Sequence, residues 1–285
     1  MKVDSVILLL SCRDRKGIVA QVANFIYKNN GNILHSDEHI DYENNIFFMR
    51  IEWDLNGFKI PSKKIEEEFK PLAQKFKMKY ILKFSNYIPN VAIFVSKFDH
   101  CLIDLLLRYR AGEFKCNIPI IISNHPDMEY LAKQYNIDFY VFPKTKDNKI
   151  GQEKKELRLL KQYSIDLIIL ARYMQILTSQ FVKRYENKII NIHHSFLPSF
   201  IGPDPYRQAY NRGVKLIGAT AHYVTEELDR GPIIEQDVIR VTHRDSIEDL
   251  KRKGRDLEKL VLAKAVRLHL ENKILVYKNK TVIFD

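Results

Sequence analysis

Short apolar runs alternate with segments of helical periodicity from residue 90 almost to the end of the chain. Strands and helices that alternate in this way form βαβ units, and a series of such units builds a mainly parallel sheet. Ligands of these sheets bind beyond the carboxyl ends of the strands. We expect an α/β domain with strands at residues 90–96, 119–123, 139–142, 166–171, 188–192, 218–224 and 233–241, and helices at residues 102–110, 128–135, 153–163 and 246–270.

The first 85 residues follow a different order. Strand and helix patterns succeed one another there as βαββαβ, the ferredoxin-like arrangement. Pro89 lies in the segment that follows, and because proline has no amide hydrogen for a sheet ladder, we interpret that segment as a linker. A length of 285 residues suits two domains, which we place at residues 1–85 and 86–285. The expected strands are 5–12, 33–40, 46–53 and 80–84, and the expected helices are 18–27 and 62–75, the second capped by Ser62.

The formal net charge of +11 is spread along the chain, and the densest lysine runs, such as Lys154-Lys155, have glutamates beside them. Mixed runs are typical of solvated helix faces, so we expect an anionic metabolite as partner and no nucleic acid. The 3 cysteines are far apart and lack metal-ligand spacing, which favours buried thiols in a reducing compartment. No apolar run reaches the roughly 18 residues of a membrane span. The N-terminal run is also too short for a signal peptide, so we expect a cytoplasmic protein with no membrane partner.

Polar residues interrupt the apolar strand near residue 190. Asn191 and His193 are two positions apart, so they point to the same side of an extended chain. A buried asparagine beside a buried histidine needs hydrogen-bond partners, and either a catalytic pair or an internal hydrogen-bonded pair meets this need. Asp229 precedes the turn-forming Gly231-Pro232, where an acid serves as a turn cap or as a catalytic group.

Two strings of residues carry a family resemblance. The first is Asn-Ile-His-His-Ser-Phe-Leu-Pro, from Asn191 to Pro198, and the second is Leu-Asp-Arg-Gly-Pro-Ile, from Leu228 to Ile233. Together they resemble the active-site signature of the formyltransferase fold that uses 10-formyltetrahydrofolate. Residues 190–222 are most similar to the deformylase branch, which hydrolyses 10-formyltetrahydrofolate to formate and tetrahydrofolate. The resemblance implies a Rossmann-like sheet, a supply of formate for purine synthesis and a balance of the one-carbon folate pools.

The resemblance also implies roles for individual residues. Asn191 and His193 would stabilise the oxyanion, and His193 would donate a proton to the leaving nitrogen. Asp229 would orient His193 and activate the water. Folate is the implied substrate, and neither a metal nor a cofactor is implied. The implied folate contacts are Met174, Ile176, Leu177, His222, Val224, Thr225 and Leu228. For the first four of these, an ordinary structural role is the alternative.

The string Asp-Arg-Lys-Gly-Ile-Val, from Asp14 to Val19, resembles the ACT domain, as does the βαββαβ order of the elements around it. The deformylase branch carries such a domain before its catalytic domain. ACT domains generally bind small effectors, often amino acids, where subunits pair. The resemblance therefore implies a homo-oligomer, dimer or tetramer, with an amino-acid effector near Asp14, Gly17 and Ile18. A pure dimerisation module is the alternative.

The segment after the first strand of the second domain bears on the acceptor of the formyl group. A transferase that uses glycinamide ribonucleotide holds the acceptor phosphate there on a glycine-rich loop. Residues 95–102 of this chain contain no glycine, and Phe98 and Asp99 oppose a phosphate. We therefore expect water as the acceptor, and transfer to an amine of glycinamide ribonucleotide or Met-tRNA is the alternative.

Two further interpretations come from other classes of protein. A catalytically silent amino-acid sensor does not require Asn191, His193 and Asp229 together. A metal hydrolase built on His193 and His194 is disfavoured because adjacent residues of a strand point to opposite faces.

Overall fold

The computed structural model describes residues 4–199 and 204–285. The sequence, with two prolines at residues 203 and 205, does not determine the conformation of the loop at 202–205. Residues 202 and 203 of this loop lie outside the described residues. The chain forms two compact units. The first comprises Met1–Ile88, Asn272–Leu275 and Val282–Asp285, and the second comprises Pro89–Glu271 and Val276–Thr281. Two segments near the C-terminus thus belong to the first unit, and residues 276–281 between them belong to the second.

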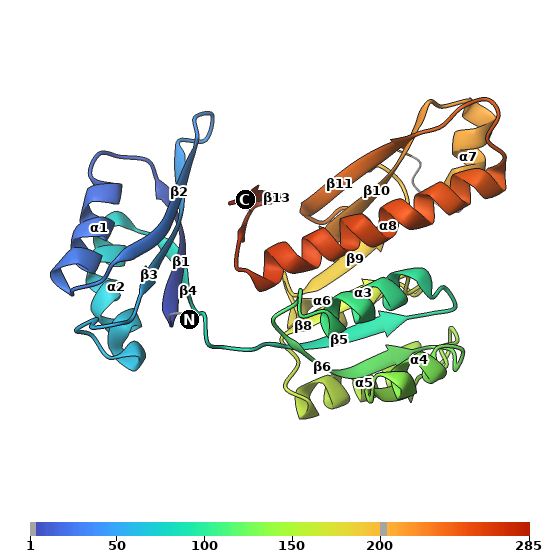
Figure 1. The fold of residues 1–285 in the computed structure, drawn as a ribbon, viewed down its shortest axis with the longest axis horizontal. Coiled ribbons are helices and arrows are strands. Elements are labelled where there is room, and N and C mark those ends of the chain that lie inside the picture. Colours follow the sequence, from blue (N-terminus) through green and yellow to red (C-terminus); the bar gives the residue numbers. More distant parts are fainter. Residues whose placement is uncertain (1–3, 200–203) are drawn as a thin grey trace. The chain divides into compact units, whose positions relative to one another are not determined.

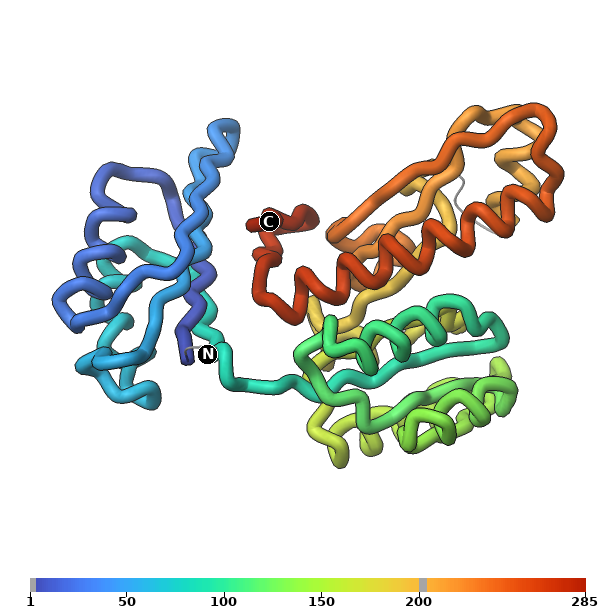
Figure 2. The backbone as a smooth tube through the Cα atoms, in the orientation of Figure 1, coloured from blue at the N-terminus to red at the C-terminus, as the bar shows by residue number. Residues whose placement is uncertain are grey.

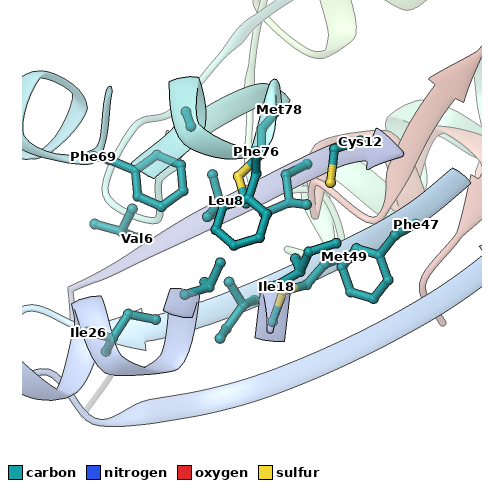
Figure 3. Packing of buried hydrophobic residues seen from close by; sticks show 14 of the residues in the cluster. Val6, Leu8, Cys12, Ile18, Ile26, Phe47, Met49, Phe69, Phe76 and Met78 are labelled. Atoms are coloured by element: carbon teal, nitrogen blue, oxygen red, sulfur yellow. The ribbon is translucent and has the colours of Figure 1, made fainter. Parts of the chain in front are cut away.

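The first unit has the expected βαββαβ order, and its antiparallel sheet has the strand order β2-β3-β1-β4 (Figure 1). Alternate residues of the first strand, such as Val6 and Leu8, pack against Ile18 and Phe69 of the two helices (Figure 3). The expected cap at Ser62 is wrong, because Ser62 begins a short 3-10 turn and the helix starts three residues later without a side-chain cap. The elements are β1 (Ser5–Arg13), α1 (Ile18–Lys28), β2 (Ile33–Asp41), β3 (Ile46–Asp54), η1 (Ser62–Lys64), α2 (Ile65–Phe76) and β4 (Lys79–Phe84).

The second unit is built on a sheet with the strand order β11-β10-β9-β8-β5-β6-β7. The pairs from β9 to β7 are parallel and β10 and β11 are antiparallel, so the sheet is mainly parallel, as expected. The chain runs outward from β5 to β7 and then returns to β8, so the topological switch point lies between β5 and β8. The strands are β5 (Asn90–Val95), β6 (Asn117–Ser123), β7 (Asp138–Val141), β8 (Leu167–Ala171), β9 (Ile189–His193), β10 (Leu216–Tyr223) and β11 (Ile233–Arg240).

Helices pack on this sheet. The longest, α8 (Ile247–Leu270), lies along β9, β10 and β11 and contacts α3 (Figure 2). A capping box between Ser246 and Asp249 begins it, close to the expected start. Two short helices, α6 and α7, and a terminal pair of strands were not expected. The remaining elements are α3 (His100–Arg110), α4 (Glu129–Gln134), α5 (Lys149–Gln162), α6 (Ser179–Arg184), α7 (Pro205–Arg212), β12 (Ile274–Tyr277) and β13 (Lys280–Ile283).

Two expectations from composition concern the described residues directly. The cysteines Cys12, Cys101 and Cys116 are buried free thiols, which confirms their expected burial. Over residues 4–199 and 204–285, no helix combines the length and the apolar character that a membrane crossing requires.

Candidate functional site

The ends of neighbouring strands bring the polar residues together. Asn191 on β9 lies opposite His222 on β10, and directly opposed residues share a face of a sheet. Asn191 Nδ2 lies 3.2 Å from His222 Nε2, and His222 Nδ1 lies 2.9 Å from the carbonyl oxygen of Tyr223. A carbonyl only accepts, so His222 Nδ1 donates to it, and Nε2 accepts from the Asn191 amide. The second amide hydrogen of Asn191 remains available to a ligand.

Asp229 lies between two histidines. One carboxylate oxygen is 3.3 Å from His193 Nδ1 and the other is 3.7 Å from His222 Nε2. Burial opposes the ionisation of Asp229, but the hydrogen bond and the positive charge that His193 supplies outweigh burial and hold its pKa well below the usual value. Asp229 is therefore a carboxylate at neutral pH.

Asp229 contacts Nδ1 of His193 and does not contact the other ring nitrogen, Nε2. His193 Nε2 is buried and has no hydrogen-bond partner among the described residues. An unpaired buried polar atom is costly, and native proteins keep few of them. We interpret Nε2 as the atom that meets the reacting group of a ligand.

Gly231 allows the Asp229 loop to lie close to β10. A Cβ at Gly231 would lie 1.7 Å from the carbonyl oxygen of Tyr223, the same carbonyl that orients His222. Asp229 itself has a left-handed φ of 54°, a conformation that Asp and Asn adopt more readily than most residues. The turn expected around Gly231-Pro232 thus has a specific purpose, which is to bring Asp229 to the histidines.

We expect Gly231→Ala to lower both stability and turnover, because the atom that the new methyl meets belongs to the backbone and cannot swing aside. Overpacking of this kind costs about 1–3 kcal/mol. The matched control is Gly151→Ala in α5, where a Cβ meets nothing within 4 Å, and it should preserve or slightly raise the melting temperature. Thermal unfolding and steady-state turnover compare the two, and equal melting temperatures would contradict the steric argument.

A cavity of about 500 Å³ opens beside these groups, a volume within the usual range of small-molecule sites. Met174 and Ile176 are 53% and 58% exposed, so the ordinary-core alternative is wrong for both. Leu177 is buried and belongs to the core as well as to the cavity wall. All the expected catalytic and substrate-contacting residues line the cavity, namely Asn191, His193, Asp229, Met174, Ile176, Leu177, His222, Val224, Thr225 and Leu228.

Other residues of the cavity wall were not assigned from the sequence. Residues 172 and 173 directly follow β8, and their place after a parallel strand next to the switch point is a signal that could have found them. His194 and Asp204 carried no such signal beyond their closeness to the first signature string. The unassigned polar and aromatic residues of the wall are Arg172, Tyr173, Gln175, His194, Asp204, Glu226 and Glu227.

A buried carboxylate on α8, Glu258, contacts Arg172 of the cavity wall. Its oxygens lie 2.8 Å from His100 Nε2, 2.7 Å from the Tyr206 hydroxyl and 3.5 Å from Arg172 Nε. Burial opposes ionisation of Glu258, but these donors and the Arg172 charge hold its pKa below the usual value. His100, Cys101 and Glu258 are the group of described residues with metal-compatible spacing. Because Glu258 already has three partners, one of them a guanidinium, we interpret the group as a hydrogen-bond network.

His194 lies between His193 and Tyr206, with ring centroids 5.3 Å and 5.9 Å away. Burial, assisted by the nearby Arg172 charge, lowers the pKa of His194 from 6.5 to about 3. Between these two values the unfolded chain binds a proton that the folded chain does not. The contribution of His194 to folding stability therefore falls as the pH drops from about 6.5 towards 3, by at most about 1.4 kcal/mol per pH unit.

We expect His194→Gln to reduce this loss of stability, because glutamine does not titrate. Urea unfolding of both proteins at pH 4, 5, 6 and 7 gives the two slopes. Parallel slopes would show that His194 does not contribute to the acid sensitivity.

The expected effector residues lie at the turn between β1 and α1. Gly17 has a φ of 92° and a Cβ there would meet nothing within 4 Å, so backbone conformation rather than space favours glycine. The Asp14 amide donates to the carbonyl of Asn45. The Ile18 side chain belongs to the core of the first unit.

Comparisons with known proteins agree with these two units. Residues 6–74 match the ACT domain family, and residues 89–266 match the formyl transferase family. A formyltetrahydrofolate deformylase from Synechocystis is 57% identical over 97% of both chains, and one from Bacillus subtilis is 49% identical over 98% of this chain and 93% of its own. The crystal structure of a formyltetrahydrofolate deformylase from Pseudomonas syringae matches with a TM-score of 0.97 and 46% identity, over 100% of this chain and 95% of that one.

Proposed function

The chain belongs to the formyltetrahydrofolate deformylase family, and on this basis we propose that it hydrolyses 10-formyltetrahydrofolate to formate and tetrahydrofolate. The observation that carries the chemistry is the group of Asn191, His193 and Asp229 beside a cavity, in which the buried His193 Nε2 has no hydrogen-bond partner within residues 4–199 and 204–285. The activity requires these groups to act on a formyl carbonyl, a water molecule and a leaving nitrogen.

Negative charge develops on the formyl oxygen when water adds to the formyl carbon. The free amide hydrogen of Asn191 and a protonated His193 Nε2 can both donate to that oxygen. Preorganised donors of this kind stabilise the tetrahedral intermediate more than the substrate, which is the requirement for catalysis.

Asp229 supports the positive charge that His193 needs. Its carboxylate is 3.3 Å from Nδ1, so it fixes the orientation of the ring and stabilises the protonated form. Collapse of the intermediate breaks the bond between the formyl carbon and N10. The adding water gives one proton to Asp229, and N10 takes a proton from His193 Nε2. Formate leaves with the oxygen of the water and releases the second water proton to solvent, while the proton on Asp229 restores the protonated His193. Asp229 is our assignment for orienting and activating that water, and none of these steps requires a metal or a cofactor.

The residues that line the cavity suit both the flat ring face and the polar edge of a folate. On one side the exposed apolar side chains of Met174 and Ile176 offer a surface for the flat ring system. On the other side Val224, Thr225 and Leu228 belong to a loop whose backbone amides and carbonyls suit the polar edge of a pterin. We assign these residues, with Leu177 and His222, to folate binding.

The turn between β5 and α3 favours water as the acceptor of the formyl group. Phe98 lies there with the guanidinium carbon of Arg172 5.0 Å and that of Arg255 5.9 Å from its ring centroid. Arg172 in turn pairs with Glu258. Among the described residues that line the cavity, none comes from residues 95–102. That segment also has no glycine with which to form a loop around an acceptor phosphate.

The direct test is incubation of the purified protein with 10-formyltetrahydrofolate and no amine. We expect steady formate release that a chelator does not change. Turnover that begins only when glycinamide ribonucleotide or Met-tRNA is added would overturn hydrolysis in favour of transfer. Chelator-sensitive turnover would overturn the metal-free mechanism.

Regulation by the first unit is a separate part of the proposal. The ACT match supports a homo-oligomer, dimer or tetramer, and an amino-acid effector near Asp14 and Gly17. We also assign to the formate a use in purine synthesis. Titration with glycine and methionine tests the effector, and if neither changes binding or rate, the ACT unit serves assembly alone.

A further inference from the structure

The middle of the loop between β8 and α6 is exposed, although the loop forms one wall of the cavity. Residues 172–177 all line the cavity, and the side chains of Met174 and Ile176 are more than half exposed. A loop that leaves its apolar side chains exposed gains little from burial, so other contacts must offset the entropy lost when its backbone is fixed. We refer to residues 172–178 as the cavity loop.

Thr178 fastens the end of the cavity loop. Its backbone amide lies 3.2 Å from Glu153 Oε1, and its hydroxyl donates to Oε2 of the same carboxylate. The same hydroxyl accepts the amide hydrogen of Phe181 and so caps α6. One buried carboxylate of α5 thus holds both the end of the loop and the start of the next helix.

Tyr173 and Met174 fasten the beginning of the loop. The Tyr173 ring packs edge-on against Phe94, with centroids 5.2 Å apart, and its hydroxyl donates to Glu156 Oε1 at 3.4 Å. The Met174 amide donates to Ser96 Oγ at 3.0 Å. The backbone is therefore anchored on both sides of the residues whose side chains face the cavity.

Glu153 and Glu156 are three positions apart on α5, so they point to the same side of the helix. They are 3% and 0% exposed. Between them lies the buried ammonium of Lys144, 2.9 Å from Glu156 and 3.8 Å from Glu153. Two carboxylates and one ammonium are expensive to bury, and apolar side chains of similar size often stabilise a fold as well or better. Glu156 Oε1, the oxygen that does not pair with Lys144, accepts from Tyr173, and both oxygens of Glu153 accept from Thr178. These contacts give the cluster a purpose other than stability.

We propose that Glu153 and Glu156 are positioning residues, which hold the two ends of the cavity loop so that Met174 and Ile176 are in place before the substrate binds. The inference rests on the proposed function, because that function assigns the loop to folate binding. The anchoring contacts themselves do not depend on that assignment.

A pair of variants at Thr178 separates positioning from simple loss of stability. Thr178→Val keeps the shape of the side chain and removes the hydroxyl that Glu153 binds, whereas Thr178→Ser keeps the hydroxyl. We expect Thr178→Val to raise KM for 10-formyltetrahydrofolate about tenfold with kcat within about twofold, and Thr178→Ser to restore KM. Val261→Ala, a cavity-forming change in the buried face of α8, is the control for lost stability and should leave KM unchanged.

Amide hydrogen exchange in the ligand-free protein tests the anchoring without any substrate. Exchange over residues 173–178 should be about tenfold faster in Thr178→Val and in Glu153→Leu than in the wild-type protein or Thr178→Ser. Unchanged exchange there in both variants would overturn the proposal, as would a fall in kcat at constant KM or an equal rise of KM in Val261→Ala. If the wild-type protein released no formate, the proposed function would fail, and the exchange rates would still decide the anchoring.

Discussion

Asn191→Ala is expected to reduce kcat for formate release by about 10²–10³-fold, the usual effect of removing one donor to a developing oxyanion. Asn191 keeps one amide hydrogen on His222 and has the second available for the formyl oxygen. Alanine removes both. Binding of tetrahydrofolate should change much less, because all the folate contacts that we assign except His222 lie on the cavity loop and on residues 224–228.

Two comparisons make this prediction specific. Asn211→Ala removes the same group from an exposed position on α7 and should leave kcat unchanged. Equilibrium binding of tetrahydrofolate to the Asn191 variant distinguishes lost catalysis from a collapsed site. If the variant kept more than about a tenth of the wild-type kcat, Asn191 would not be an oxyanion donor.

Asp229→Asn is expected to reduce kcat by about 10²–10⁴-fold, the range attributed to acid–base groups. Asparagine has nearly the same shape and also tolerates the left-handed φ of 54° at this position, so the loop should keep its conformation. The variant loses the negative charge that supports a protonated His193. The pKa of Asp229 lies well below its usual value, so the carboxylate stays ionised as the pH falls towards 4 and should not cause an acid limb in that range.

The matched change Asp256→Asn, at an exposed position of α8, should leave turnover unchanged. Rates of both variants from pH 5 to 8, together with their melting temperatures, show whether the charge at position 229 or the loop conformation is responsible. A fully active Asp229→Asn enzyme would remove Asp229 from the mechanism and leave it as a turn residue.

Features that lie within one element were predictable from the sequence. The two-residue spacing of Asn191 and His193 predicted that both point to one side of a strand, and β9 covers both residues. Helical periodicity predicted α8 and its start to within a residue. Missed elements were short, such as α7, although Asp204 before Pro205 and Gly213 after Arg212 are ordinary start and stop signals for a helix.

The charge of a helix face was predicted less well. The mixed run around Lys154-Lys155 was expected to be a solvated face, which is correct for the two lysines and wrong for the glutamates on either side of them. Glu153 and Glu156 are buried because Lys144 and the cavity loop reach them from other parts of the chain. No local pattern could distinguish them from surface glutamates.

The sequence by itself determined the element order of the first unit and the order of the sheet strands and longer helices of the second. It also determined the direction in which Asn191 and His193 point and, through family resemblance, the expected reaction. Each of these depends on periodicity or on a string within a few residues. Only the tertiary structure decided that Asp229 lies between His193 and His222 and that no described residue forms a hydrogen bond with His193 Nε2. It also decided that Glu258 and Glu153 bind residues of the cavity wall. These partners are distant in sequence, and they meet because strand register and helix packing place the ends of separate elements at one edge of the sheet.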